Sequence, residues 1–308
     1  MNSPQSQATS RPDVVGLGYA DWDHLAIVPG QPEFDTDTMT LQASAQCGGG
    51  PVATALVTLR RLGANVGYLG TLGDDEPGRR ILTDLQRAGV DTTRLIVQPG
   101  ERSHTCLVLV EANTGRRCIL CDRGTLQPLQ LTDADRQYIC QARFLHLDGQ
   151  FMDAAITAAR WAQDSSVRVS FDANRPRPRL DELLPLVDVL VTSTSFPTAC
   201  TGHDDLEKAL QTLHTQGPET VVVTLGPQGC AYLDGNRLAH VPGYRVDVVD
   251  TTGAGDAFHG AFLYGLLQNW DARETARFAN AVAALNCRSL GGRAALPTLA
   301  EARAFLRQ

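Results

Sequence analysis

The sequence predicts an α/β protein in which a mostly parallel sheet lies between layers of helices. Short apolar segments alternate along the chain with longer segments whose apolar residues recur at helical spacing. That alternation is typical of a parallel sheet covered by helices. Segments 187–191 and 221–225 are almost continuously apolar, as expected of strands that are buried on both faces.

Local patterns predict the individual elements. Residues 51–62 predict a helix, because Leu56, Leu59 and Leu62 are at helical spacing and proline is tolerated at its first turn. A second helix, 79–88, ends at Gly89. The other expected strands are 14–17, 66–69 and 167–171, and the other expected helices are 153–161, 205–214, 299–306 and two helices after residue 256.

One stretch interrupts the alternation. Residues 104–110 and 116–121 flank the turn Asn113-Thr114-Gly115 and predict a β-hairpin. Segments 33–46 and 100–125 together are expected to form a small sheet that stands off the main one. No linker separates a second independent domain, so we expect one large domain over residues 11–308.

Composition limits the classes of function. The first ten residues are polar and predict a disordered tail rather than a signal peptide, and no apolar run is long enough to span a bilayer. The net charge of −7 argues against nonspecific binding of nucleic acid and against a polybasic membrane contact. We therefore expect a cytoplasmic protein that binds neither nucleic acid nor membrane.

The eight cysteines fit a reducing compartment. Cys118 and Cys121 form a Cys-x-x-Cys pair, for which zinc binding or redox chemistry is the functional interpretation. No second pair with ligand spacing exists, so a role as ordinary strand residues is favoured.

The most informative run is Asp-Thr-Thr-Gly-Ala-Gly-Asp-Ala-Phe-His-Gly-Ala-Phe-Leu, residues 250–263. An apolar stretch leads into small residues that allow a tight turn, and a helix-periodic segment follows. Unpaired N–H groups at a helix start attract anions. Asp256 is placed to accept a proton from a hydroxyl beside a bound phosphate. The alternative is a plain connection in which Asp256 only caps the helix.

The whole run resembles the second signature of the PfkB (ribokinase-like) carbohydrate kinases, and it is not a Walker A loop. The matching residues are Asp250, Thr251, Gly253, Ala254, Gly255, Asp256, Gly260 and Ala261. The resemblance extends over residues 14–306. It implies a ribokinase-like three-layer fold, with the small sheet as a lid over the sugar and as a contact for a homodimer.

The resemblance also implies a mechanism. The γ-phosphoryl of ATP passes in line to a sugar hydroxyl, Asp256 takes the hydroxyl proton, and the N–H groups of Gly253, Ala254 and Gly255 stabilise the phosphoryl charge. Mg²⁺ bridges the phosphates. Relatives often hold Mg²⁺ through Asn-x-x-Glu, but a gapless alignment places Ser193 and Phe196 at those positions. We therefore expect Mg²⁺ to rest on the ATP phosphates and water.

The substrate side follows from three further segments. Residues 48–55 resemble the first family signature, which places the sugar against Gly49 and Gly50, with Thr54 where the family usually has asparagine. Asp23 corresponds to the carboxylate that grips sugar hydroxyls, and Asp21 is the alternative if the register differs.

Residues 171–175 resemble a stretch of fructokinases. There Asn174 would contact the sugar and Arg175 would neutralise phosphoryl charge. The alternative for Arg175 is a surface arginine in a loop rich in arginine and proline.

The nucleotide side is implied by two segments. Thr224, Gly226 and Gly229 resemble the phosphate loop of the family, and Ala283 and Asn286 lie in the segment that lines the adenine site in relatives. Carbonyls near Asp250 and Gly291 would hold a monovalent cation such as K⁺.

The motifs together are most similar to the branch that contains fructokinase-like enzymes and sulfofructose kinase, so a ketose such as D-fructose is the favoured substrate. The segment near residues 33–40 is acidic, which argues against an anionic sugar, although Arg123 keeps sulfofructose open. The alternatives are 2-keto-3-deoxygluconate kinase, purine nucleoside kinase and a sugar or nucleotide sensor without catalysis.

Overall fold

The computed structural model describes residues 11–35 and 37–307. The expected tail, residues 1–10, lies outside the described residues. None of the helices in the described part of the chain is long and apolar enough to cross a bilayer.

The main sheet has nine strands in the order β13-β12-β11-β10-β9-β8-β1-β4-β5. Neighbouring strands are parallel except at one edge, where β12 lies antiparallel to both β11 and β13. The bounds are β1 (Val14–Leu17), β4 (Val66–Gly73), β5 (Asp91–Gln98), β8 (Phe144–Leu147), β9 (Arg168–Ala173), β10 (Val189–Thr192), β11 (Thr220–Thr224), β12 (Cys230–Asp234) and β13 (Arg237–Val241). The prediction of a mostly parallel sheet is confirmed.

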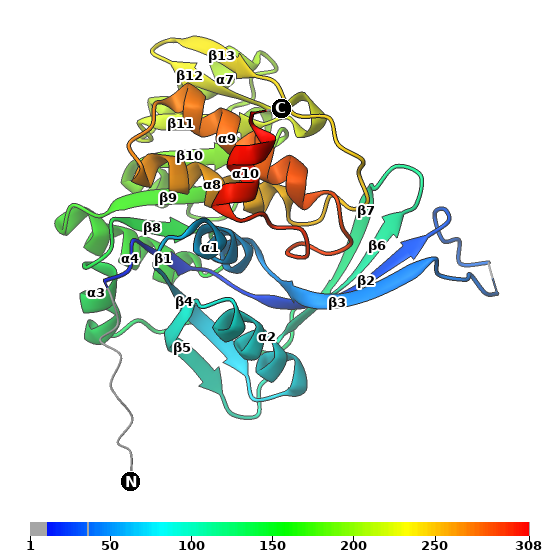
Figure 1. Cartoon of the computed structure of the whole chain (residues 1–308). Coiled ribbons are helices and arrows are strands. Elements are labelled where there is room, and N and C mark those ends of the chain that lie inside the picture. The colour runs from blue at the N-terminus through cyan, green and yellow to red at the C-terminus, as the bar shows by residue number, and fades with distance from the viewer. Residues whose placement is uncertain (1–10, 36, 308) are drawn as a thin grey trace.

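Helices cover both faces of this sheet and produce three layers (Figure 1). One face packs against α1 (Pro51–Leu62), α2 (Glu76–Arg87), α8 (Ala254–Leu267), α9 (Ala272–Asn286) and α10 (Leu299–Phe305). The other packs against α3 (Asp133–Ile139), α4 (Met152–Asp164), α5 (Leu180–Leu183), α6 (Phe196–Thr201) and α7 (Leu206–His214). Each layer buries its own apolar cluster against the sheet, and this burial is the main favourable contribution to folding.

Helix α8 carries the most informative sequence run. It lies against α1 and α9 and is buried nearly all round, which explains its apolar sequence. The helix starts at Ala254, earlier than the predicted residue 257, because Gly253 adopts a left-handed φ of 70° and serves as its N-cap. Asp256 therefore lies in the first helical turn. Residues 244–249, which precede it, form no strand.

The small sheet has four strands in the order β3-β2-β6-β7 and projects from the main body (Figure 1). Its strands are β2 (Asp21–Val28), β3 (Ala43–Gly49), β6 (His104–Glu111) and β7 (Arg117–Asp122). The predicted hairpin corresponds to β6 and β7. Of segment 33–46 only the part from Ala43 forms a strand, and β2 was not predicted, because its charged residues interrupt the apolar pattern. We call this sheet the lid sheet.

Candidate active site

The start of α8 is a candidate anion site. Gly255 and Asp256 lie in the first helical turn, where N–H groups have no acceptor within the helix. The N–H of Ala254 donates to the carbonyl of Thr251 at 3.3 Å, which leaves the neighbouring N–H groups as the better candidates for phosphate. A Cβ at Gly253 would lie 2.6 Å from the carbonyl oxygen of Gly292, so only glycine allows these loops to meet.

Two buried side chains fix the turn before α8. Asp250 accepts hydrogen bonds from the N–H of Thr252 at 2.8 Å and from the N–H of Gly291 at 2.9 Å. The amide of Asn286 donates to the carbonyls of Thr252 and Gly292 at 3.2 and 3.1 Å. Asn286, predicted to contact the nucleotide, is fully buried and joins the two loops. Its role toward the nucleotide stays a prediction.

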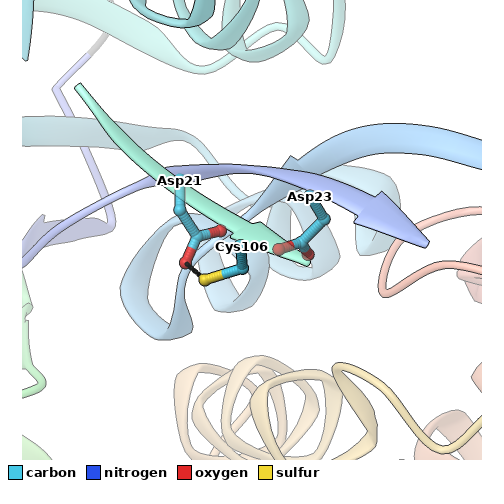
Figure 2. Close-up of side chains that lie close together, drawn as sticks. All are labelled: Asp21, Asp23 and Cys106. Atoms are coloured by element: carbon cyan, nitrogen blue, oxygen red, sulfur yellow. Dashed lines mark hydrogen bonds between the residues drawn. The ribbon is translucent and has the colours of Figure 1, made fainter. Parts of the chain in front are cut away.

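Asp21 and Asp23 lie together at the base of the lid sheet (Figure 2). Both are buried, and Oδ1 of Asp21 has no hydrogen-bond partner among the described residues. The register of β2 pairs Asp21 with Gly49, and a Cβ at Gly49 would overlap both carboxyl groups. This site therefore presents buried oxygen acceptors beside a bare backbone, which suits a ligand rich in hydroxyl groups.

The carboxyl groups influence one another. Burial raises the pKa of Asp256 to about 6, and the charge of Asp172 adds to the rise. Burial also raises the pKa of Asp23 to about 6, an effect that Arg293 opposes and Asp256 reinforces. Burial and the charge of Asp23 raise the pKa of Asp21 well above its ordinary value. Neighbouring carboxyl groups with raised pKa values are typical of functional sites.

Arg293 is a site residue that the sequence did not reveal. Its guanidinium donates to Thr54 Oγ1 at 3.0 Å, to Asp84 Oδ2 at 2.6 Å and to the carbonyl of Gly49 at 2.5 Å. It thus fastens the glycine segment to α2 and to the loop after α9. The hydroxyl of Thr54 is engaged by Arg293, and its contact with a sugar stays a prediction. In the sequence, the only signal for this arginine is the run Gly-Gly-Arg-Ala, residues 291–294, which resembles the fructokinase-like branch of the family.

A buried ion pair lies behind Asp256. His259, one helical turn further along α8, places Nε2 at 3.2 Å from Asp172 Oδ1. Burial alone would lower the pKa of His259, but the charge and hydrogen bond of Asp172 raise it above its ordinary value. Burial alone would raise the pKa of Asp172, but His259 lowers it. Both shifts in pKa favour the ionised form of this pair.

The residues predicted after β9 are exposed. Arg175 and Asn174 are both exposed, and the carbonyl of Asn174 accepts a hydrogen bond from Ser193 at 3.0 Å. Arg177 is more enclosed: Nη1 donates to Gln150 at 3.2 Å, and Nη2 is buried without a partner among the described residues. The predicted roles of Arg175 and Asn174 remain predictions. Arg177 is an additional candidate for contact with an anionic group of a substrate.

Three residues predicted to hold the nucleotide, Thr224, Gly226 and Gly229, lie at or just after the carboxyl end of β11, where α/β proteins bind ligands. Thr224 ends this strand, and its hydroxyl donates to the carbonyl of Thr192 at 3.1 Å. Gly226 begins the short 3₁₀ turn η2 (Gly226–Gln228) and Gly229 follows it, and both have positive φ. Ala283 is half-buried on α9.

The two positions that often supply the magnesium motif hold no carboxylate here. Ser193 donates to the carbonyl of Asn174, and Phe196 is fully buried at the start of α6. The donor set fits a Mg²⁺ ion that ATP phosphates and water hold, because Mg²⁺ commonly keeps several waters.

The tip of the lid hairpin contacts the turn before α8. Arg117 Nη1 donates to Thr251 Oγ1 at 2.9 Å, and that hydroxyl donates to the carbonyl of Gly115 at 3.1 Å. Arg117 also lowers the raised pKa values of Asp23 and Asp256, after larger effects of burial. The lid sheet is thus joined to the anion site by side chains that are far apart in the sequence.

The fold and the site together define a phosphotransferase that acts on a sugar hydroxyl. The chain belongs to the pfkB family of carbohydrate kinases, whose model matches residues 13–299. The family prediction and the ribokinase-like fold are therefore confirmed, and the chain is a sugar kinase.

The chain is similar to several sugar kinases. An ATP-dependent ribose-1-phosphate kinase of Halopiger xanaduensis is 32% identical over 298 residues, which cover 95% of this chain and 97% of that protein. The ribokinase of Haemophilus influenzae is 27% identical, covering 96% and 99%. Fructokinase-1 of Oryza sativa is 29% identical, covering 82% and 86%.

Solved structures agree. A ribokinase II of E. coli in complex with ATP and Mg²⁺ has a TM-score of 0.84 at 26% identity, covering 96% of this chain and 99% of that one. A ribokinase-like protein from Agrobacterium tumefaciens has a TM-score of 0.87 at 28% identity, covering 96% and 98%. ATP as the phosphoryl donor is consistent with both the family and the ATP complex.

Proposed function

We propose that this enzyme transfers the γ-phosphoryl of ATP to a hydroxyl of a small sugar, with a ketose such as D-fructose as the first candidate. The observation that carries the proposal is the placement of Asp256 in the first turn of α8, beside free N–H groups and near the buried carboxyls of Asp21 and Asp23. An acceptor for a hydroxyl proton, an anion site and a grip for further hydroxyls then share one region.

Each group has a distinct task. Asp21 and Asp23 accept hydrogen bonds from hydroxyl groups of the sugar and orient it against Gly49 and Gly50. Asp256 takes the proton of the reacting hydroxyl, and the N–H groups at the start of α8 stabilise the charge on the transferring phosphoryl group. When bound, Mg²⁺ neutralises phosphate charge. Most of the rate arises from positioning and electrostatics.

The first experiment measures ADP release from ATP and Mg²⁺ with D-fructose, other ketoses, D-ribose, 2-keto-3-deoxygluconate, sulfofructose and adenosine. Asp256→Asn keeps the shape of the side chain but removes the base, and general-base catalysis contributes about 10²- to 10⁴-fold. We expect turnover of one neutral ketose and its loss by at least about 100-fold in the variant. Turnover of adenosine alone would favour a nucleoside kinase, and silence across the panel with intact ATP binding would favour the sensor.

A sugar that already carries an anionic group is the second candidate. Arg177 Nη2 is buried without a partner among the described residues, and both Arg123 and Arg175 are close enough to lower its pKa, after the larger effect of burial. A phosphate or sulfonate would supply the missing acceptor. The relative from Halopiger xanaduensis is named for ribose 1-phosphate.

This candidate is tested by comparing ribose 1-phosphate with ribose and sulfofructose with fructose. If the substrate is an anionic sugar, its kcat/KM should exceed that of the neutral sugar about tenfold or more, because a charge-assisted hydrogen bond supplies that difference. Arg177→Gln should remove the preference, whereas the exposed Arg179→Gln should keep it. Equal kcat/KM values for charged and neutral sugars would exclude this candidate.

We also propose that a monovalent cation such as K⁺ binds near Asp250 and Gly291. Its effect would act through the turn before α8, which both residues fix. Replacing K⁺ by tetramethylammonium at constant ionic strength should lower kcat. An unchanged kcat would exclude a cation requirement.

A homodimer through the lid sheet is likewise proposed. Leu107 and Leu120 are cross-strand partners that share one face of the sheet, and both are exposed. Leu120→Glu should convert a dimer to a monomer in light scattering, and a wild-type monomer at micromolar concentration would refute the proposal.

The cytoplasm is the proposed location. All eight cysteines are free thiols, which fits a reducing compartment. Cell fractionation tests this, and recovery with a secreted fraction would contradict it.

A further inference from the structure

Two cysteines of the lid sheet lie opposite each other. The register of β6 and β7 pairs Cys106 with Cys121, and their Sγ atoms are 2.8 Å apart. Directly opposed residues of antiparallel strands have Cα atoms about 4.5–5.5 Å apart, which falls within the range of about 4.4–6.8 Å that a disulfide needs. The backbone therefore needs no rearrangement for these thiols to join.

The same pair lies beside the sugar carboxylates. Sγ of Cys106 is 3.7 Å from Asp21 Oδ2, and the thiol can donate to that oxygen (Figure 2). Cys106 is also the register partner of Asp23 on the adjacent strand β2. Cys106 is buried and Cys121 is exposed, so a reagent from solution reaches one thiol and the second lies directly behind it.

We propose that Cys106 and Cys121 are a site of reversible oxidation, at which a peroxide forms a disulfide that weakens sugar binding. The thiolate of Cys121 attacks the peroxide, takes one oxygen and becomes a sulfenic acid, while the second oxygen leaves as hydroxide, which is protonated to water. The sulfur of Cys106 then displaces the sulfenic hydroxyl as a second water. Two thiols are oxidised by two electrons, and one hydrogen peroxide is reduced to two waters.

Cys121 reacts first because it is exposed, whereas Cys106 is buried. Burial and the charge of Asp21 raise the pKa of Cys106 well above its ordinary value, so this thiol stays protonated until a partner sulfur is activated. Cys118 is no substitute partner. It lies opposite Leu109, and it is three residues from Cys121 on the same strand, so its side chain points to the other face.

The effect on activity rests on the proposed role of Asp21 in holding the sugar. In the disulfide, Cys106 has no proton to donate, and its sulfur is bonded to β7. The buried carboxyl of Asp21 then loses the only partner that its Oδ2 has among the described residues. We expect the KM for the sugar to rise about 5- to 10-fold, with a smaller change in kcat.

The experiment treats fully reduced enzyme with a small excess of hydrogen peroxide in the presence of EDTA, alkylates remaining thiols, and maps peptides without reduction. Wild type and Cys118→Ser should both yield a Cys106–Cys121 linked peptide with a loss of about 2 Da, the mass of two hydrogens. Both should show the raised KM, and dithiothreitol should restore it. Cys121→Ser, an exposed and conservative change, should show neither effect.

Several outcomes would overturn the inference. These are a linked peptide with another pairing, oxidation of Cys121 to sulfinic acid without a link, and an equal loss of sugar binding in Cys121→Ser. A complete link with unchanged KM would remove the effect on the sugar site. If the link forms but the reduced enzyme phosphorylates no sugar, the proposed function fails and the oxidation site stands.

Discussion

In the proposed mechanism Asp256 is a base, which requires its ionised form, and its environment determines when that form exists. Burial raises the pKa of Asp256 to about 6, and burial does the same for Asp23. As the pH falls through about 6, both groups take up protons, so the acid limb of activity lies well above the ordinary carboxyl range near 4.

This pair predicts a steep pH profile. Because kcat/KM reports ionisations of the free enzyme, log kcat/KM should fall below pH of about 6 with a slope of at least about 2, to which Asp21 adds because its pKa is also raised. Steady-state assays between pH 4.5 and 8 measure it. In Asp23→Asn the slope should be smaller by about 1. A flat profile down to pH of about 5 would contradict the assignment of both carboxyls.

His259 pairs with Asp172, whose charge raises the pKa of the proposed base Asp256. Removing its imidazolium in His259→Gln leaves Asp172 buried without its partner, and such a loss costs about 3–5 kcal/mol of stability. The unpaired charge of Asp172 should also move the acid limb of kcat/KM to higher pH. Urea unfolding and the pH profile test both effects.

A double variant separates the effect of losing the imidazolium of His259 from the effect of the unpaired charge of Asp172. Adding Asp172→Asn to His259→Gln removes the unpaired charge, so the acid limb should return toward the wild-type position. If His259→Gln alone leaves the acid limb of kcat/KM unchanged, the role of His259 is purely structural.

At the scale of elements, the lid sheet and the turn before α8 meet through Arg117 and Thr251. Arg117→Ala should lower kcat/KM for the sugar about 3- to 10-fold, because it removes one charge-assisted hydrogen bond and a nearby cation. The adjacent Arg116→Ala is the matched control, since the ion pair of Arg116 among the described residues is with Glu111 at the surface. Equal effects of both variants would mean that the contact does not matter for turnover.

Local periodicity predicted much of the fold. The helix at residues 51–62 and the lid hairpin agree with the structure, because apolar spacing and turn residues act within a few positions. Strand β2 was missed because Asp21 and Asp23, placed there for the site, interrupt its apolar pattern. Function and local propensity conflict at such positions.

Site candidates could be proposed from the sequence where residues belong to a recognisable motif, whereas partners outside such motifs were missed. The run from Asp250 to Asp256 is visible in the sequence. Arg293 bonds to Gly49, which is 244 positions away, and Arg117 bonds to Thr251, 134 positions away. Such partners are selected by tertiary packing, and no local pattern marks them.

For the whole molecule, the strand order brings the ends of β8, β9, β10 and β11 to one edge of the sheet, beside the lid. A sugar bound there stabilises only the folded chain. At about 100 times its dissociation constant, the true sugar should raise the free energy of unfolding by about 2.7 kcal/mol. Urea titration with each panel sugar measures this. Asp23→Asn should abolish the gain, and a gain that survives would place the sugar elsewhere.

The carboxyls proposed to hold the sugar belong to β2, which begins after the three residues that follow β1 and runs on to the far end of the lid sheet. One continuous strand thus connects the proposed sugar site with the far end of the lid sheet. A change in the tilt of this strand on sugar binding would move the loop that follows it, which carries the exposed Phe34. The signal of a dye attached to this loop would then report whether a sugar is bound, without any group being placed in the sugar site.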